Sequence, residues 1–180
     1  MPNPMRMMFL ALAALLVSGS AAAFQPDVNE ELQLDVAKAI LAIKKADPGI
    51  EAFFDSAAGY AVFPSVGKGG IVVGAAYGKG LVIVGERVDG YTTMTQATVG
   101  LQLGGQVYSL FIFFKDDAAI ANFRRGNFEF AAQASAVAAT AGASADTSYD
   151  KGVAVFTHAA GGLMVEGSVG GQRFTYVPKQ

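Results

Sequence analysis

The feature that most constrains the fold is a run of four large apolar side chains, Phe111-Ile112-Phe113-Phe114. Successive side chains of a β-strand point to opposite faces of the sheet. A strand without polar alternation must therefore be buried on both faces. The run closes an apolar segment, 106–114, and Lys115 follows it directly. We expect 106–114 to be a strand in a central, doubly buried position.

Shorter β-branched runs bounded by glycine indicate further strands. The clusters GKGG at 67–70 and GKG at 78–80 are typical of turns, because glycine tolerates positive φ. The pair Asp89-Gly90 is a hairpin signal. The strands predicted in addition to 106–114 are 61–63, 71–76, 81–84, 92–98, 99–103, 153–157, 162–167 and 172–177.

The stretch 127–142 is open to two interpretations. Its many alanines favour a helix by propensity. Phe128, Phe130 and the alanines that follow alternate with polar residues at the strand period. We predict a strand, because small side chains suit a tightly packed or curved sheet.

Helices are predicted near the N-terminus and after the central strand. Apolar residues recur at helical spacing over 27–46, with acidic residues toward its start and lysines toward its end, which complements the helix dipole. Asp47-Pro48-Gly49 should end this helix. Because the apolar stripe is wide, we expect it to pack on a core rather than insert into a membrane. Shorter helices are expected over 50–57 and 117–124.

Asp116 is the expected N-cap of the helix 117–124, with Ile120 and Phe123 facing inward. Together these elements predict an α+β fold. We expect a mainly antiparallel, strongly curved or barrel-like β-structure with N-terminal helices.

The first 23 residues have the composition of a cleavable secretory signal peptide. Arg6 carries the only charged side chain before Asp27, 7–17 is apolar, and the segment ends in Ala21-Ala22-Ala23. The apolar run is shorter than the roughly 20 residues that a membrane span needs. An uncleaved anchor or a buried core helix is the alternative. We expect cleavage near Ala23, one domain over 24–180, and a periplasmic or secreted location.

Composition excludes several classes of function. The 180 residues include no cysteine, so a lipid anchor on cysteine, disulfides and thiolate metal sites are absent. The formal net charge of −2 argues against general nucleic-acid binding, which requires many phosphates to be neutralised. His158 is the sole histidine, more typical of a strand end than of a catalyst, and no G-x-S-x-G motif is present. We expect neither an enzyme nor a cofactor.

Basic residues in three places are the candidates for lipid or anion binding. Lys68 and Lys79 lie in the two glycine clusters, where open backbone amides and an ammonium suit a phosphate. Solvated turn lysines fit the sequence at least as well. Arg124 and Arg125 form the only adjacent arginine pair, which helix-end capping also explains. Lys44 and Lys45 end the helix 27–46 and complete the candidate set.

Residues 59–84 (GYAVFPSVGKGGIVVGAAYGKGLVIV) and 98–114 (TVGLQLGGQVYSLFIFF) resemble the SYLF domain. The likeness continues through 134–137 and through GLMVEGSVGGQRF at 162–174. The elements V-F-P, G-x-G, G-L-Q-L-G-G-Q and G-L-M in this order are specific as a set. The resemblance therefore covers nearly all of 24–180.

The resemblance implies a binding domain rather than an enzyme. Eukaryotic SYLF domains bind phosphoinositide membranes, partly through an amphipathic N-terminal helix, and some bind actin. The matching helix here is 27–46. For an exported protein we expect a peripheral partner that is an anionic lipid or membrane surface, and no nucleic acid. The alternatives are a structural or protein-interaction module of the cell envelope and a hydrolase built around His158.

Overall fold

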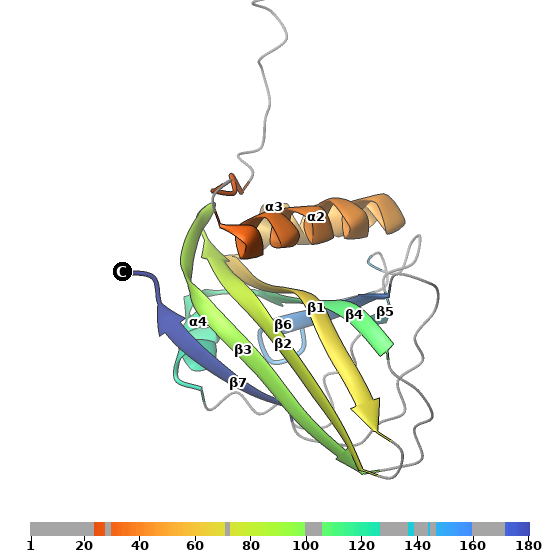
Figure 1. The fold of residues 1–180 in the computed structure, drawn as a ribbon. Helices are drawn as coiled ribbons and strands as arrows, with labels where there is room; N and C mark the ends of the chain where they lie inside the picture. Colours follow the sequence, from red (N-terminus) through yellow and green to blue (C-terminus); the bar gives the residue numbers. More distant parts are fainter. Residues whose placement is uncertain are drawn as a thin grey trace, which may run out of the picture.

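The structure is a computed structural model. It describes residues 24–27, 30–70, 73–99, 106–126, 137–138, 144, 147–159 and 172–180. The predictions for 1–23, 100–103, 127–136 and 162–167 lie outside the described residues. Figure 1 shows the elements in chain order: α2 (Glu31–Ala46), η1 (Pro48–Ile50), α3 (Glu51–Ser56), β1 (Gly59–Gly70), β2 (Val73–Val84), β3 (Arg87–Val99), β4 (Gln106–Phe114), α4 (Asp117–Arg124), β5 (Val137–Ala138), β6 (Val153–Ala159) and β7 (Gln172–Pro178).

The strands form one sheet in the order β5-β6-β4-β1-β2-β3-β7. Every pairing is antiparallel except the short parallel one between β5 and β6. The α+β class and the mainly antiparallel sheet are therefore confirmed. The expectation of a barrel-like or strongly curved sheet is wrong, because β5 and β7 stand at opposite edges and the sheet is open. A barrel has one interior, whereas this sheet has a core on each face.

The central strand β4 lies between those two cores, as predicted. Leu110, Ile112 and Phe114 belong to a cluster with residues of α4 and β7. Phe111 and Phe113 belong to a second cluster, on the face that α2 and α3 cover. All five side chains are at most 1% exposed. Burial of both faces explains why this segment has no polar alternation.

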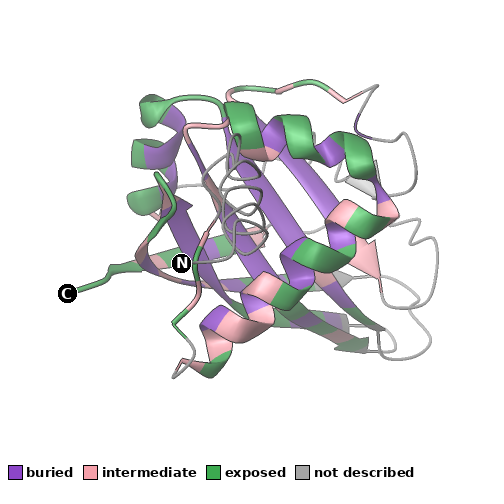
Figure 2. Ribbon diagram, turned by 90° about the horizontal axis from the view of Figure 1, so that it is seen from above, coloured by how far each residue is buried: buried purple, intermediate pink, exposed green. Residues whose placement is uncertain are grey.

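Helix α2 packs across β1 and β2 through one side (Figure 2). Its buried apolar residues, Val36, Ala39, Ile40 and Ile43, belong to the cluster around Phe113. Leu41 lies on the outer side and is 69% exposed. The helix ends at Ala46, as predicted, with Asp47 as its C-cap. The Asp47 carboxylate accepts hydrogen bonds from the amides of Gly49 (3.2 Å) and Ser144 (2.7 Å). This buried carboxylate ties the end of α2 to a distant part of the chain.

Helix α4 has the predicted bounds and the predicted N-cap. Asp116 accepts a hydrogen bond from the amide of Ala119 at 2.9 Å. Ile120 and Phe123 are buried in the core on this face of the sheet. The short helix predicted over 50–57 is present as η1 and α3.

The two glycine clusters are parts of long strands, so the prediction of glycine turns at 67–70 and 78–80 is wrong. Lys68 pairs with Ala76, and Ser65 pairs with Lys79, within the β1–β2 ladder. Glycine is needed at 80 for a different reason. A Cβ there would lie 2.5 Å from the Val62 carbonyl oxygen and 2.7 Å from the Phe63 ring. Gly80 therefore permits the close packing of β2 against β1.

The hairpin between β2 and β3 turns at Gly85-Glu86 rather than at Asp89-Gly90. Both turn residues have positive φ, 53° and 69°, as a type I′ turn requires. Asp89 is the extra residue where the pairing shifts from Val82–Gly90 to Ile83–Val88. The Asp-Gly signal thus marks a bulge next to the hairpin.

Candidate functional site

The sheet extends beyond α2, and none of the described helices covers the rest of this face. On β2, β3 and β4 the face that carries Leu81, Tyr91 and Phe111 under the helices continues outward at every second residue. The strand register extends this face onto β1 and β7. We call this uncovered area the open face. It comprises Ser65, Gly67, Gly69, Ala75, Tyr77, Lys79, Thr93, Thr95, Ala97, Val107, Arg173 and Thr175, all exposed except the half-buried Thr93.

The strand register gives the order of side chains across the open face. One row runs Val107–Gly67–Tyr77–Thr95–Arg173, and the next runs Ser65–Lys79–Thr93–Thr175. The hydroxyls of Thr93 and Thr175 are hydrogen bonded to each other. Glycine and alanine occupy many of the other positions, so nothing large surrounds Tyr77 along β1. The result is a surface of mostly short side chains with one aromatic ring near its middle.

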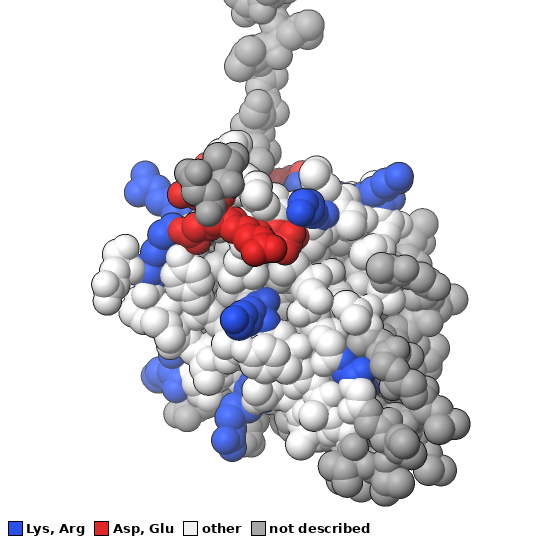
Figure 3. All heavy atoms as spheres, in the orientation of Figure 1, with Lys and Arg blue, Asp and Glu red and all other residues white. Residues whose placement is uncertain are grey.

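The open face has a positive charge although the chain is acidic overall. Lys79 and Arg173 are its charged residues, and its twelve positions include no carboxylate. Tyr77 and Val107 are large apolar groups that are 50% and 60% exposed. Figure 3 shows the acidic side chains gathered near α2, whereas the surface below them, over β1 to β3, shows separate basic side chains. Such a face suits an anionic partner that also accepts apolar contact.

The structure does not bring the six predicted binding residues together. Lys79 lies on the open face. Lys68 lies on the opposite face, because it pairs with Ala76 and lies two residues after Val66 in β1, and both of these residues belong to the core on that side. Two lysines expected at neighbouring strand ends are thus separated by the sheet. Sequence reasoning missed Tyr77 and Arg173. An uninterrupted strand over 73–84 would have shown that Tyr77 and Lys79 share a face.

The arginine pair is engaged within the fold. Arg124 Nε donates to the Asp89 carboxylate at 2.9 Å, and its guanidinium lies over the Tyr176 ring, 5.8 Å from the centroid. The Tyr176 hydroxyl donates to the same carboxylate at 2.7 Å. Burial of Tyr176 raises its pKa to about 12, and the hydrogen bond to Asp89 and the charge of that carboxylate act in the same direction. Arg125 is exposed and donates to Asn122.

The lysines at the end of α2 have different surroundings. The Lys44 ammonium lies 2.7 Å from Glu51 Oε1 and 4.7 Å from the Phe54 ring centroid. Lys45 is exposed in the last turn of the helix. Neither lies on the open face. Of the six candidates, the structure therefore places only Lys79 on this surface.

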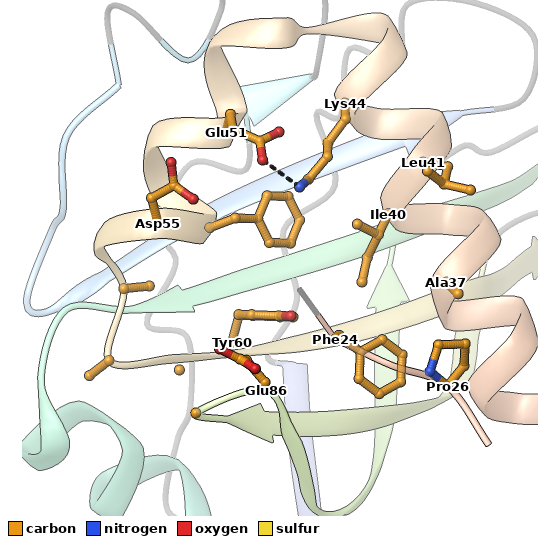
Figure 4. A pocket seen from close by; sticks show the side chains of 15 residues that line it. Phe24, Pro26, Ala37, Ile40, Leu41, Lys44, Glu51, Asp55, Tyr60 and Glu86 are labelled. Atoms are coloured by element: carbon orange, nitrogen blue, oxygen red, sulfur yellow. Dashed lines mark hydrogen bonds and ion pairs between the residues drawn. The ribbon is translucent and has the colours of Figure 1, made fainter. Parts of the chain in front are cut away.

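A pocket of about 640 Å³ lies between α2 and α3, away from the open face. We call it the helix pocket (Figure 4). Its lining comes from the N-terminal segment, both helices, the start of β1 and the β2–β3 turn: Phe24, Pro26, Ala37, Ile40, Leu41, Lys44, Glu51, Phe54, Asp55, Ala57, Ala58, Gly59, Tyr60, Gly85 and Glu86.

The described residues contain no assembled catalytic or metal centre. His158 lies on β6 opposite Ser109, whose hydroxyl donates to the Pro64 carbonyl at 2.7 Å rather than to the histidine. No group of three or more metal-ligating side chains is found within the described ranges. In the same part of the chain, none of the helices has the length and apolarity needed to cross a membrane.

Comparisons with known proteins give two findings. Residues 95–177 match the family described as Ysc84, Las17-binding protein actin regulator. The chain is 28% identical over 138 residues to Beta cell expansion factor A of Aeromonas veronii, an alignment that covers 76% of this chain and 52% of the relative. The chain spans about half the length of this curated relative.

Proposed function

We propose that this chain, a member of the SYLF family through its residues 95–177, docks peripherally on anionic lipid surfaces through the open face. The family is generally one of binding domains and not a known enzyme family. Its membership supports a lipid-binding or actin-associated module. We propose in addition that the lipid is anionic, that the open face is the docking surface and that the protein is extracytoplasmic.

The observation that carries the proposal is the chemistry of the open face. A basic residue near an anionic membrane surface contributes about 1 kcal/mol. Lys79 and Arg173 together then contribute about 2 kcal/mol, with no carboxylate among the face's residues to oppose them. Tyr77 adds an amphipathic ring of the kind that favours the lipid–water interface, and Val107 adds exposed apolar area. Charge and apolar contact therefore act on the same partner.

Helix α2, the element that the family resemblance implies for membrane contact, is less suited to that role here. Its apolar side is buried against the sheet, with Val36 and Ile43 fully inaccessible. Insertion of that side into a membrane would expose the core cluster around Phe113. Leu41 is the large apolar residue left on its outer side. The open face offers an apolar and basic surface without any rearrangement.

The proposed location is periplasmic or secreted, after cleavage of 1–23 near Ala23. In that setting phosphate-bearing headgroups of envelope lipids are the proposed partners, and phosphoinositides or actin are not required. The domain that docks is 24–180.

Vesicle co-sedimentation of the purified protein tests the proposal. Phosphatidylcholine vesicles are compared with vesicles containing 30% phosphatidylglycerol, each at roughly 20 mM and 500 mM salt, across which the Debye length falls severalfold. We expect binding to the anionic vesicles at low salt and its loss at high salt. Equal binding to both compositions, or no binding to either, would refute the proposal. Indifference to lipid combined with a stable envelope protein partner would instead favour an interaction module.

A further inference from the structure

The helix pocket differs in charge from the open face. Its lining includes one ammonium group, Lys44, and three carboxylates, Glu51, Asp55 and Glu86. Lys44 already pairs with Glu51 at 2.7 Å, and the dashed line in Figure 4 marks this contact. Asp55 and Glu86 therefore leave the lining side chains with a net negative charge, and the balance stays negative with the single α-ammonium that Phe24 would carry after cleavage near Ala23. An anionic headgroup would meet repulsion here.

Aromatic and aliphatic side chains form the body of the pocket. Ile40 and Ala37 come from α2, Phe54 from α3, and Tyr60 from the start of β1. Phe24 packs against the same core from the N-terminal segment. In Figure 4 the Tyr60 side chain points across the pocket toward α2, with Glu86 next to it. A volume of about 640 Å³ is within the range of small-molecule sites.

Aromatic rings beside carboxylates attract cations, because the ring faces carry negative potential. The chain itself shows this preference, since the Lys44 ammonium lies over the Phe54 ring. Burial and then the negative charge of Glu86 raise the pKa of Tyr60 to about 12. Glu86 thus acts electrostatically on a group in the pocket. The Tyr60 ring lies beside that carboxylate, and the Phe24 ring lines the same pocket.

We propose that the helix pocket binds an amphiphile with a cationic head, such as an alkylammonium or quaternary ammonium compound. Its alkyl chain lies against Ile40, Phe54 and Phe24. Its cationic head lies beside Glu86 and the Tyr60 ring, which are neighbours in Figure 4, and Asp55, on the α3 side of the pocket, adds to the attraction. Complementary charge selects this ligand over anionic amphiphiles with the same tail. This site is separate from the open face and does not depend on vesicle docking.

The test uses three decyl probes with matched tails, each below its micelle concentration: decyltrimethylammonium, decanol and decyl sulfate. Binding to the full chain is followed by calorimetry and by amide chemical shifts. The pocket variant is Asp55→Asn with Glu86→Gln. The matched control is Asp117→Asn with Glu31→Gln, which removes the same charge from exposed helix starts outside the pocket lining.

We expect decyltrimethylammonium to bind tightest and to shift amides of Ile40, Phe54 and Tyr60. Exposed charge pairs contribute modestly to binding, because solvent screens them. Loss of both carboxylates should therefore weaken the cationic probe about 5- to 20-fold and leave decanol unchanged. The control should change cationic binding less than twofold. Equal affinity for the three probes, preference for decyl sulfate, no binding of the cation, or an equal loss in the control would each overturn the proposal.

Thermal unfolding of both variants checks that they fold. Vesicle docking is measured on the same samples. A pocket variant that keeps anionic vesicle binding but loses the cationic probe separates this inference from the proposed function.

Discussion

Removal of the two charges on the open face should weaken vesicle binding far more than removal of two charges elsewhere. The perturbation is Lys79→Gln with Arg173→Gln. At about 1 kcal/mol for each residue, the double variant loses about 2 kcal/mol of membrane affinity. Since 1.4 kcal/mol corresponds to a tenfold change, the partition coefficient should fall about 30-fold.

Co-sedimentation with vesicles containing 30% phosphatidylglycerol at low salt measures this change. The matched control is Lys45→Gln with Arg125→Gln, two exposed basic residues that lie off the open face. It removes the same net charge and should lower partitioning less than threefold. All four residues are solvent-exposed, so thermal unfolding should be nearly unchanged in both variants. A control that loses as much as the open-face variant would refute the reasoning, because binding would then follow net charge rather than the face.

Three further predictions concern the fold. Phe113→Ala should cost about 3–5 kcal/mol in chemical denaturation, because its fully buried ring contacts four other rings; a loss under 1 kcal/mol would contradict the assigned core. Asp47→Ala should cost about 1–3 kcal/mol by the same assay, since it leaves the buried amide of Ser144 without its acceptor. Tyr60 and Tyr176 have pKa values raised to about 12, so the fold favours their protonated forms. The stability this provides is fully present below about pH 10, the pKa of an unfolded tyrosine, and is lost as the pH rises toward 12. Denaturant midpoints should therefore fall over that range and fall less in Tyr60→Phe; a flat profile in the unmodified chain would contradict this.

The sequence predicts best those elements whose signals are local. The doubly apolar run 111–114 must be buried on both faces, and the Asp116 cap and the Asp47-Pro48-Gly49 stop need only their neighbours. These features are present in the structure as predicted.

The candidate site could not be predicted to the same extent, because it depends on register between distant strands. Lys68 and Lys79 appear equivalent in their glycine clusters, yet the pairing shift between Val62 and Ser65 and the continuity of β2 place them on opposite faces. Glycine at 80 reflects close strand packing, which composition does not distinguish from a turn. Arg173 joins Tyr77 only because β7 pairs with β3 at Thr95. No short-range pattern encodes that strand pairing.

The open sheet was also beyond local signals. Small residues over 127–142 suit a tightly packed or curved sheet, but most of them lie outside the described residues. The separation of the edges β5 and β7 follows from the helices that cover both faces of the central strands. Coverage of this kind is a property of the whole fold.

Depth-dependent quenching by brominated lipids tests most directly whether the open face is the docking surface. The chain contains no tryptophan, so one indole introduced at a chosen site is a unique reporter. Tyr77→Trp places it on the open face, and Leu41→Trp places it on the outer side of α2, where Leu41 is 69% exposed. With anionic vesicles brominated near the headgroup, we predict strong quenching of the indole at position 77 and little at position 41. Strong quenching at position 41 with none at position 77 would contradict docking through the open face and would assign it to the helix.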